Sequence, residues 1–228
     1  MITHTLFPTT ICEFEYEDSS KFKENLWEVA LNHIKDGRSD EIIDPYLHHD
    51  EKLKDIYFFI TNSIREYLSV FNIDLDDLDF HISKSYFNIT DKDPNPKHHH
   101  LDSHMSFIYY AHIPEDVKLN IKFFTTYMGE PHSCFFETFN KEWNWHNSSS
   151  WTFESTEGHL FIFPGDVNHQ VVAAEDNFVK GKNSLVSTLE DFKKMRISIV
   201  GDGMFTYKNM YQNTRTHGVH PISSWKKF

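Results

Sequence analysis

The sequence predicts a mainly β protein, a sandwich or barrel of short strands with two helices packed against its outside. Two segments near the start carry apolar residues at helical spacing, and later segments switch to the two-residue period of strands. The chain contains 21 phenylalanines and has an aromatic share of 16%, which supplies large apolar side chains for a core. With 228 residues, it is expected to form a single domain, residues 1–228.

The two helices are predicted at residues 21–35 and 51–71, within a helical lead-in that covers about residues 18–71. In both segments apolar side chains recur every three or four positions, so each helix has one face that can pack on a sheet. Asp18 and Ser19 are start signals for the first helix. The apolar positions are Phe22, Leu26, Val29, Ala30 and Ile34, then Leu53, Ile56, Phe59, Ile60, Ile64, Leu68 and Val70.

Strands replace helices after Asp77, and the predicted β core covers about residues 80–201. The segments are short, rich in aromatic and β-branched residues, and separated by Gly, Pro, Asn and Asp turn signals. The predicted strands are residues 80–89, 105–113, 119–127, 151–153, 159–163, 170–173 and 195–200.

Two stretches of the core lack strand periodicity. Residues 131–150 are rich in Trp, His, Asn and Ser, which predicts a loop near the mouth of the barrel, placed to contact substrate. Residues 177–194 are a polar interruption, and within them Ser187-Thr-Leu-Glu190 is typical of a capped helical turn.

The charge balance is acidic, with 34 Asp and Glu against 22 Lys and Arg and a net charge of −12. Such a chain has no field that attracts nucleic acid or anionic lipid, so neither is an expected partner. The first residues lack the pattern of a secretory signal, and the two cysteines, Cys12 and Cys134, form no C-x-x-C pair. We therefore expect a soluble, cytoplasmic protein, and the sequence leaves its oligomeric state open.

The segment Lys97-His-His-His-Leu-Asp-Ser-His104 is the densest group of candidate metal ligands. Residues two apart on a strand point to the same side, so His100 and Asp102 can offer an imidazole and a carboxylate to one ion. The segment Gly158-His-Leu-Phe-Ile-Phe-Pro-Gly-Asp-Val-Asn-His169 ends one strand in a turn and places His169 at the start of the next. Two histidines and one carboxylate leave three positions on Fe(II) open, as an oxygenase requires.

A second motif, Arg196-Ile-Ser198, places a guanidinium and a hydroxyl on one face of a strand. This pair suits the far end of a buried dicarboxylate, because a guanidinium matches a carboxylate with two hydrogen bonds. Arg215 is the alternative residue for this role.

In order and spacing, the motifs His100-x-Asp102, Gly158-x-x-x-x-Phe-Pro-x-x-x-x-His169 and Arg196-x-Ser198 resemble those of the 2-oxoglutarate- and Fe(II)-dependent oxygenases. The run His100-x-x-x-x-x-Ser106-x-x-Tyr109-Tyr110 resembles a branch of small oxygenases found in bacteria and phages. The preceding Ser85-Tyr86-Phe-Asn88 also fits, and the resemblance covers roughly residues 80–201. The gap between His169 and Arg196 is longer than is usual in this family, so the resemblance implies that residues 177–194 are an insertion if Arg196 matches the family's arginine.

The resemblance implies a double-stranded β-helix (jelly-roll) core with the two helices packed outside. It also implies the cofactors Fe(II), 2-oxoglutarate and dioxygen. The expected reaction is hydroxylation of an unactivated C–H bond in a small molecule or peptide, with release of succinate and CO2. The implied catalytic metal ligands are His100, Asp102 and His169, and the implied 2-oxoglutarate-binding residues are Arg196, Ser198, Tyr110, Tyr86 and Asn88.

Two other functions stay open. A cupin-type metal enzyme on a related barrel would use His98, His100, His104 and His169 without 2-oxoglutarate. A non-catalytic binding domain would keep the barrel as an interaction scaffold and bind no metal. In the oxygenase, His98, His99 and His104 would instead be surface residues or support the ligands. Asp102 therefore distinguishes the two metal enzymes.

Overall fold

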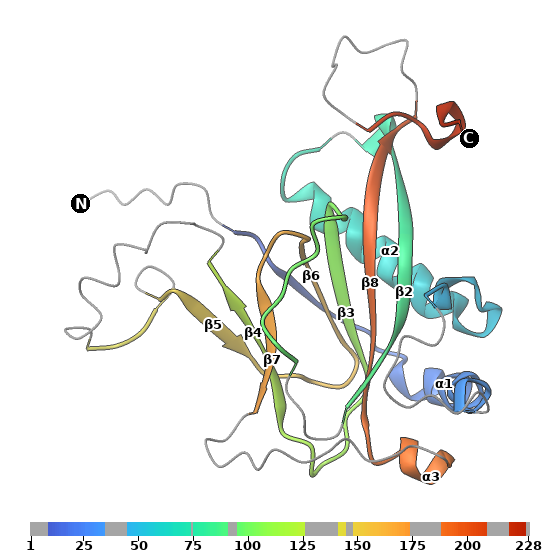
Figure 1. Cartoon of the computed structure of the whole chain (residues 1–228), viewed down its shortest axis with the longest axis vertical. Helices are drawn as coiled ribbons and strands as arrows, with labels where there is room; N and C mark the ends of the chain where they lie inside the picture. The colour runs from blue at the N-terminus through green and yellow to red at the C-terminus, as the bar shows by residue number, and fades with distance from the viewer. Residues whose placement is uncertain are drawn as a thin grey trace.

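The computed structural model describes residues 9–34, 45–73, 75–90, 95–125, 141–144, 148–173, 188–208 and 219–226. Within these residues eight strands form two antiparallel sheets, and two long helices lie outside the larger sheet (Figure 1). The predicted mainly β architecture is thereby confirmed. Most of the predicted loop 131–150, the first part of the insertion 177–194 and Arg215 lie outside the described residues.

The larger sheet has the strand order β1-β6-β3-β8-β2, so its neighbours are mostly distant in sequence. β8 lies between β2 and β3 and is antiparallel to both. These strands are β1 (Cys12–Glu15), β2 (Leu78–Thr90), β3 (Met105–His112), β6 (His159–Pro164) and β8 (Arg196–Tyr207).

The smaller sheet has the order β5-β4-β7 and faces the larger one across an apolar layer (Figure 1). Its strands are β4 (Leu119–Phe124), β5 (Ser150–Phe153) and β7 (His169–Ala173). The layer between the sheets is aromatic at its centre, where the ring of Phe123 packs against those of Phe161 and Phe163. Its buried members are Ile108, Tyr110, Ile121, Phe123, Phe161, Phe163 and Val167.

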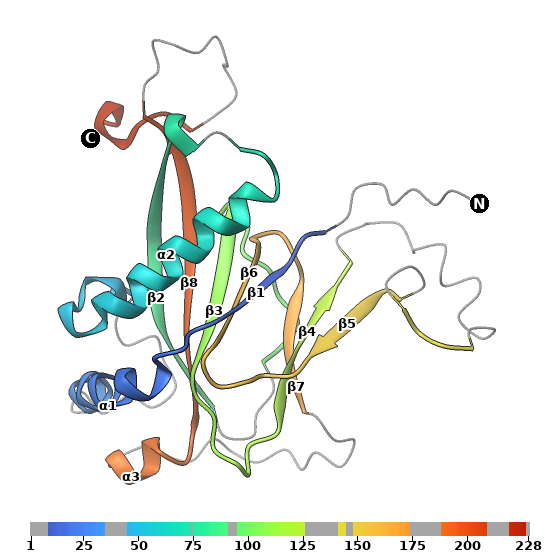
Figure 2. The same cartoon turned by 180° about the vertical axis from the view of Figure 1, so that it is seen from behind.

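The helices α1 (Ser19–Ile34) and α2 (Lys54–Ser69) cover the other face of the larger sheet. Figure 2 shows α2 crossing β2, β8 and β3. Ile56, Ile60 and Ile64 recur every fourth residue along α2, so all three are buried on one side of the helix. Burial of each large apolar side chain contributes roughly 1.5–3 kcal/mol to the free energy of folding. This burial holds the helices on the sheet.

Strand alternation separates the two faces of β8. Ile197 and Ile199 join the core beneath the helices, whereas Arg196, Ser198, Val200 and Asp202 have the opposite parity and face the smaller sheet. We call this side the inner face. Its register is fixed by the neighbours, since Ser198 pairs with both Asn88 and Tyr110, and Asp202 pairs with Lys84 and Ser106.

Two strands of the fold differ from the sequence prediction, and one predicted turn is confirmed. β1 was not predicted, and β8 continues to Tyr207, seven residues beyond the predicted end at residue 200. The expected capped turn is confirmed as α3 (Leu189–Phe192), where Thr188 and Asp191 form a capping box. Short 3-10 turns occupy Leu47–His49, Glu51–Leu53, Leu75–Asp77 and Ile222–Ser224.

None of the helices in the described part of the chain has the length and hydropathy needed to span a membrane.

Candidate metal centre

Three histidines from two segments converge beside the aromatic layer. His98 and His100 lie two residues apart in the segment before β3, and His169 is the first residue of β7. One ring nitrogen of each lies within 4.8 Å of those of the other two. Imidazole nitrogen is a ligand for Fe, Zn, Cu and Ni ions, so this donor set fits a first-row transition metal.

The backbone brings His98 and His169 together. The two residues form an antiparallel bridge outside the named strands, and their ring centroids are 4.3 Å apart. His100 is anchored next to them, because its amide donates to the carbonyl of Gly165 at 2.7 Å. A Cβ at Gly165 would lie 2.5 Å from the Ser103 carbonyl oxygen and 2.8 Å from that of His100. Only glycine permits this close approach.

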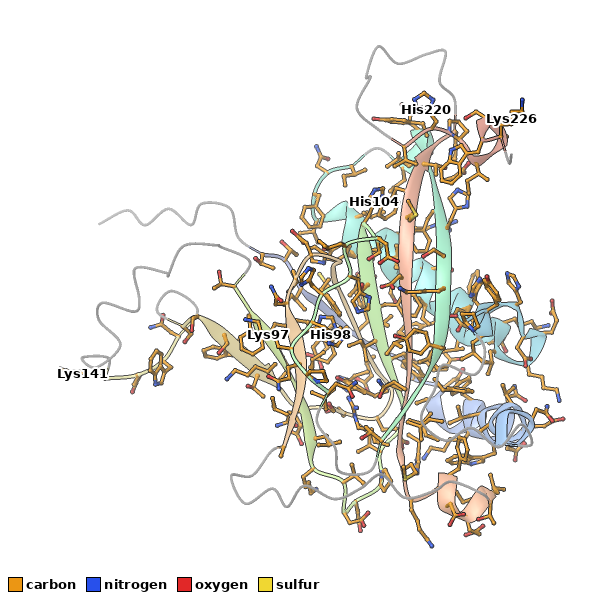
Figure 3. All side chains as sticks on the ribbon, viewed as in Figure 1. Lys97, His98, His104, Lys141, His220 and Lys226 are labelled. Carbon is orange, nitrogen blue, oxygen red and sulfur yellow. The ribbon has the colours of Figure 1, made fainter. Side chains whose placement is uncertain are left out.

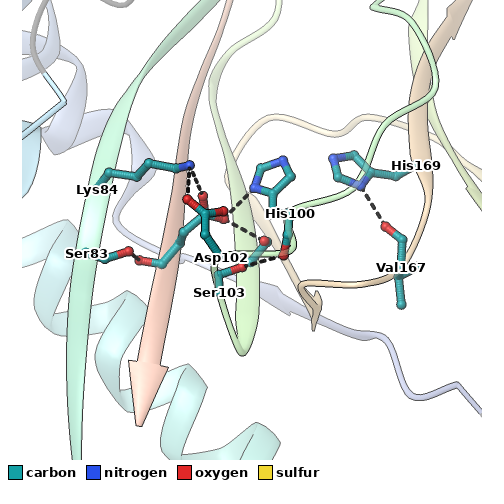
Figure 4. Close-up of polar contacts among 9 residues, drawn as sticks. Ser83, Lys84, His100, Asp102, Ser103, Val167 and His169 are labelled. Carbon is teal, nitrogen blue, oxygen red and sulfur yellow. Dashed lines mark hydrogen bonds and ion pairs between the residues drawn. The ribbon is translucent and has the colours of Figure 1, made fainter. Parts of the chain in front are cut away.

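Each of the three rings uses its Nδ1 atom for a hydrogen bond to an oxygen. Nδ1 of His98 contacts the Pro96 carbonyl at 2.8 Å, and Nδ1 of His169 contacts the Val167 carbonyl at 3.0 Å. Nδ1 of His100 lies 2.5 Å from Oδ1 of Asp202. Because these oxygens accept, each Nδ1 carries the proton and each Nε2 keeps a lone pair for a metal. Figure 4 shows the unbonded nitrogens of His100 and His169 on the sides where the two rings face each other.

His169 is the most buried of the three, with 4% of its surface exposed. Burial is the main cause that lowers the pKa of its imidazole to about 4. The hydrogen bond to Val167 opposes the shift, and the neighbouring His98 and His100 add to it. The ring is therefore neutral at pH 7 and can act as a ligand without losing a proton first.

Asp102, predicted as a ligand, lies outside this cluster. Its side chain is 75% exposed and its Oδ2 forms an ion pair with Nζ of Lys84 at 3.4 Å. The structure thus brings together His100 and His169 of the predicted triad, and it places His98, which the sequence assigned to the surface or a supporting role, where a third ligand would stand.

Asp202 is a buried acid at this centre that the sequence analysis missed. The side chain is 1% exposed, and its Oδ1 contacts His100 and accepts from Oγ of Ser106 at 2.6 Å. Lys84 joins Asp202 to Asp102, because its Nζ also lies 2.9 Å from Oδ2 of Asp202 (Figure 4). The period-two signal existed, since Asp202 has the same parity as Arg196 and Ser198. The flanking Gly201 and Gly203 are typical of a strand end, so the sequence pattern alone does not extend the strand to Asp202.

Arg196, predicted to bind 2-oxoglutarate, lies on the inner face and is 1% exposed. Its guanidinium carbon lies 4.8 Å from the centroid of the Tyr110 ring. Among the described residues, Nε and Nη1 of Arg196 and the hydroxyl of Tyr110 have no hydrogen-bond partner. A buried cation with two unpaired nitrogens is unfavourable, so this arrangement fits an anion such as a carboxylate.

The other residues predicted to bind 2-oxoglutarate share the same face. Ser198 of β8 pairs with Tyr110 of β3 and Asn88 of β2, which forms one row across the three strands. Tyr86 belongs to the next row, opposite Val200, and its pKa is raised, mainly by burial. Register places all five predicted residues on the inner face with Arg196 at one end and the row of Asp202 at the other.

The remaining histidines of the dense segment have other contacts. Nδ1 of His99 lies 3.3 Å from Oδ1 of Asn168, and Nδ1 of His104 accepts a hydrogen bond from the Phe205 amide at 2.9 Å. The ring of His104 also stacks on Phe205. Figure 3 places His104 well away from His98. His104 is therefore not brought to the three-histidine cluster.

Two antiparallel sheets enclose an aromatic layer and carry a histidine cluster beside it, which is the arrangement of a jelly-roll domain with a candidate metal centre. Residues 86–180 match the sequence profile of a family described as "Putative 2OG-Fe(II) oxygenase". This match confirms the predicted resemblance to the 2-oxoglutarate- and Fe(II)-dependent oxygenases. A comparison with curated proteins finds no match.

Solved structures are similar to this chain at low sequence identity. The non-heme alpha-ketoglutarate-dependent epimerase SnoN from nogalamycin biosynthesis has a TM-score of 0.52 at 10% identity, over 88% of this chain and 82% of its own. The non-heme monooxygenase ThoJ has a TM-score of 0.52 at 8% identity, over 86% and 74%. A prolyl-4-hydroxylase from Pseudomonas putida has a TM-score of 0.48 at 14% identity, over 85% and 86%. SnoN and ThoJ show the fold, which confirms the double-stranded β-helix.

The matched family implies Fe(II), 2-oxoglutarate and dioxygen as cofactors, and the three histidines can hold the iron. The buried guanidinium of Arg196, with two unpaired nitrogens, fits a carboxylate-bearing cosubstrate. Both features of the described residues agree with these cofactors.

Proposed function

We propose that this protein is a 2-oxoglutarate-dependent hydroxylase whose Fe(II) is held by His98, His100 and His169. The observation that carries the proposal is the coexistence of two groups on one interior surface. Three imidazole nitrogens converge within 4.8 Å, and the buried guanidinium of Arg196 lacks a partner for two nitrogens among the described residues. A chelating keto acid with a distal carboxylate has the chemistry to connect them.

The three histidines leave enough of a metal ion's coordination shell open for a chelating cosubstrate and dioxygen. Three protein nitrogens on a six-coordinate ion leave three positions free, as many as two histidines and one carboxylate would. Neutral imidazoles add no negative charge, so the ion keeps a stronger attraction for an anionic keto acid. Asp102 is not part of the proposed ligand set, because its carboxylate pairs with Lys84 and is largely exposed.

Strand spacing supports the proposed placement of 2-oxoglutarate. The backbone of Arg196 lies three rows along β8 from that of Asp202. Its guanidinium, however, lies over the ring of Tyr110, and Tyr110 belongs to the row of Ser198. That row is four residues from the row of Asp202, roughly 13 Å along a strand. An extended five-carbon dicarboxylate, bound to a metal at one end and hydrogen-bonded at the other, occupies much of this interval. Arg196 and the hydroxyls of Ser198 and Tyr110 would bind its far carboxylate.

The chemistry that the bound cofactors supply is oxidative decarboxylation of 2-oxoglutarate to succinate and CO2, coupled to hydroxylation of a substrate C–H bond. The part of the chain is to orient and to exclude water. Phe123 and Phe163 pack against the His169 ring, with centroids 6.2 and 4.9 Å away. This apolar wall keeps water from one side of the centre, which protects a reactive site from side reactions.

The proposed substrate is a small molecule or a peptide. Two structurally similar proteins are an epimerase and a monooxygenase, so this fold supports more than one reaction outcome. Hydroxylation is proposed because it needs no group beyond those assigned above. The net charge of −12 gives no support to a nucleic-acid substrate.

One observation favours a second candidate, a metal enzyme of the cupin type that does not use 2-oxoglutarate. Three of the four histidines that it requires, His98, His100 and His169, form the cluster, and no carboxylate is among them. This candidate gives Arg196 no anion to bind, and it gives no role to the match with the oxygenase family.

Anaerobic titration of the Fe(II) protein with 2-oxoglutarate separates the two candidates. The proposed function predicts a visible charge-transfer band that saturates with one equivalent of keto acid, and substrate-independent turnover of 2-oxoglutarate to succinate in air. Bound iron without such a band would favour the cupin-type enzyme. Failure to bind Fe(II), Co(II) or Zn(II) would favour a non-catalytic binding domain.

A further inference from the structure

Asp202 occupies a buried position at which three different side chains bind one carboxylate. Its Oδ1 contacts Nδ1 of His100 at 2.5 Å and accepts from Oγ of Ser106 at 2.6 Å, while its Oδ2 pairs with Nζ of Lys84 at 2.9 Å. Ser106 and Lys84 are its register partners on the two neighbouring strands. The carboxylate is therefore held in one orientation from both sides.

The other two partners of Asp202 do not accept hydrogen bonds from it. The Lys84 ammonium, which carries only donors, forms an ion pair with Oδ2, and the Ser106 hydroxyl donates to Oδ1. An ionised carboxylate accepts hydrogen bonds and does not donate them, so the proton between it and His100 is on Nδ1 of His100.

The two carboxylate oxygens divide their partners. Lys84 contacts Oδ2, whereas His100 and Ser106 share Oδ1. A purely structural ion pair with Lys84 would need Oδ2 alone. The contact from Oδ1 to a metal-ligating ring is the arrangement that fixes a histidine's tautomer and ring orientation and raises its basicity in metalloproteins.

His98 and His169 lack such a partner, because their Nδ1 atoms contact the neutral carbonyls of Pro96 and Val167. Among the described residues, Asp202 is the one carboxylate in contact with a ring of the cluster. A centre of three imidazoles lacks the negative charge that a ligating carboxylate would bring, and Asp202 places one charge directly behind His100.

We propose that Asp202 is the positioning residue of the metal centre: it holds His100 as the Nδ1–H tautomer, aims its Nε2 at the ion and supplies the charge that the three-histidine ligand set lacks. The proposal rests on the proposed metal function. It assigns Asp202 no contact with substrate or metal. By the same geometry, Ser106 and Lys84 keep the carboxylate in place.

Two measurements on full-length Asp202→Asn test this, with Asp102→Asn as the matched control at the other acidic partner of Lys84. In the metal-free protein, imidazole 15N shifts report the tautomer of His100. We expect the Nδ1–H form in the wild type and in Asp102→Asn, and a mixture of tautomers in Asp202→Asn. Co(II) titration should give a dissociation constant 10–100-fold higher for Asp202→Asn and one within about twofold of wild type for Asp102→Asn.

Ser106→Ala and the double variant Lys84→Met/Asp202→Asn keep the test decisive if Asp202→Asn folds poorly. Ser106→Ala should weaken Co(II) binding by a smaller factor, since it leaves the carboxylate but frees it to move. The double variant also removes the Lys84 cation, which Asp202→Asn alone would leave without its buried carboxylate partner, so the double variant should fold. It should still bind Co(II) 10–100-fold more weakly than Lys84→Met.

A lower melting temperature of Asp202→Asn with unchanged Co(II) affinity and unchanged His100 tautomer would overturn the proposal, because a structural role predicts that result. If the wild type binds no Co(II), the proposed function fails. The tautomer measurement still decides whether Asp202 sets the proton position of His100.

Discussion

The backbones of His98 and His169 exchange two hydrogen bonds, from the His98 amide to the His169 carbonyl at 3.0 Å and from the His169 amide to the His98 carbonyl at 2.9 Å. Directly paired residues of an antiparallel bridge point their side chains to the same side. The bridge therefore fixes the distance between two candidate ligands that are 71 positions apart in the sequence. It also explains why His98, rather than Asp102, stands beside His169.

Replacing His98 by alanine should abolish the visible band of the Fe(II)–2-oxoglutarate complex and weaken Co(II) binding at least 100-fold, because one of three ligands is lost. Asp102→Ala should keep the band and bind Co(II) nearly as well as the wild type. Parallel anaerobic titrations of the two variants measure this. The reverse ranking would restore the triad of His100, Asp102 and His169.

Arg196→Met should stabilise the protein measured without 2-oxoglutarate. The change replaces a buried, partly unpaired cation with an apolar side chain of similar length, which is worth up to about 1–4 kcal/mol. The same variant should lose 2-oxoglutarate binding while it retains Co(II). Arg65→Met, at an exposed arginine of α2, is the control and should change neither property. Urea unfolding with and without the keto acid measures both effects, and destabilisation of metal-free Arg196→Met would contradict the assignment.

Gly165→Ala should destabilise the fold by about 1–3 kcal/mol and weaken metal binding more than tenfold. The new Cβ would meet backbone oxygens of Ser103 and His100, which cannot move without displacing His100. Gly158→Ala is the control: Gly158 has a φ of 86°, so the alanine costs about 1–2 kcal/mol of backbone strain. Its amide binds the carbonyl of Tyr110, in the row of Ser198, which is four residues along β8 from the row of Asp202. Chemical denaturation and Co(II) titration of both variants test this. Equal metal affinities would show that the contact at Gly165 is only structural.

Glu157 should make the fold sensitive to acid. Burial alone would raise the pKa of its carboxyl, but hydrogen bonds from His112, Lys23 and the amide of Ile113 lower it to about 2. Since the unfolded chain has the ordinary value of 4.5, it binds more protons between pH 4.5 and 2. The stabilisation is therefore present above pH 4.5 and is lost as the pH falls towards 2.

Glu157→Gln should cost about 1–2 kcal/mol at pH 7, with a difference from wild type that shrinks between pH 4.5 and 2. Glu190→Gln, at a side chain that is 73% exposed in its pair with Lys193, should stay within about 0.5 kcal/mol of wild type. Unfolding free energies across this pH range are the measurement. A difference that is independent of pH would mean that the glutamate contributes through packing and not through its charge.

The sequence by itself determined the fold class, because apolar periodicity and turn residues are local signals. The helices and seven of the strands followed from them, and so did the face of β8 that carries Arg196 and Ser198. β1 was not predicted because its four residues, Cys12–Glu15, are too few for the two-residue period of a strand to be recognised. Asp202 was not predicted because the flanking Gly201 and Gly203 look like a strand end. In the structure these glycines lie within β8, because a Cβ at Gly201 or Gly203 would collide with the ring of Phe107 or Phe80.

Only the tertiary structure decided which side chains meet at the metal centre. On an ideal strand His98, His100 and Asp102 would all point the same way, so spacing could not choose among them. The chain turns after His100, where its amide binds Gly165, and this turn sends Asp102 to Lys84 while the bridge to β7 holds His98 beside His169. Long-range hydrogen bonds, which leave no local trace in the sequence, therefore selected the three histidines.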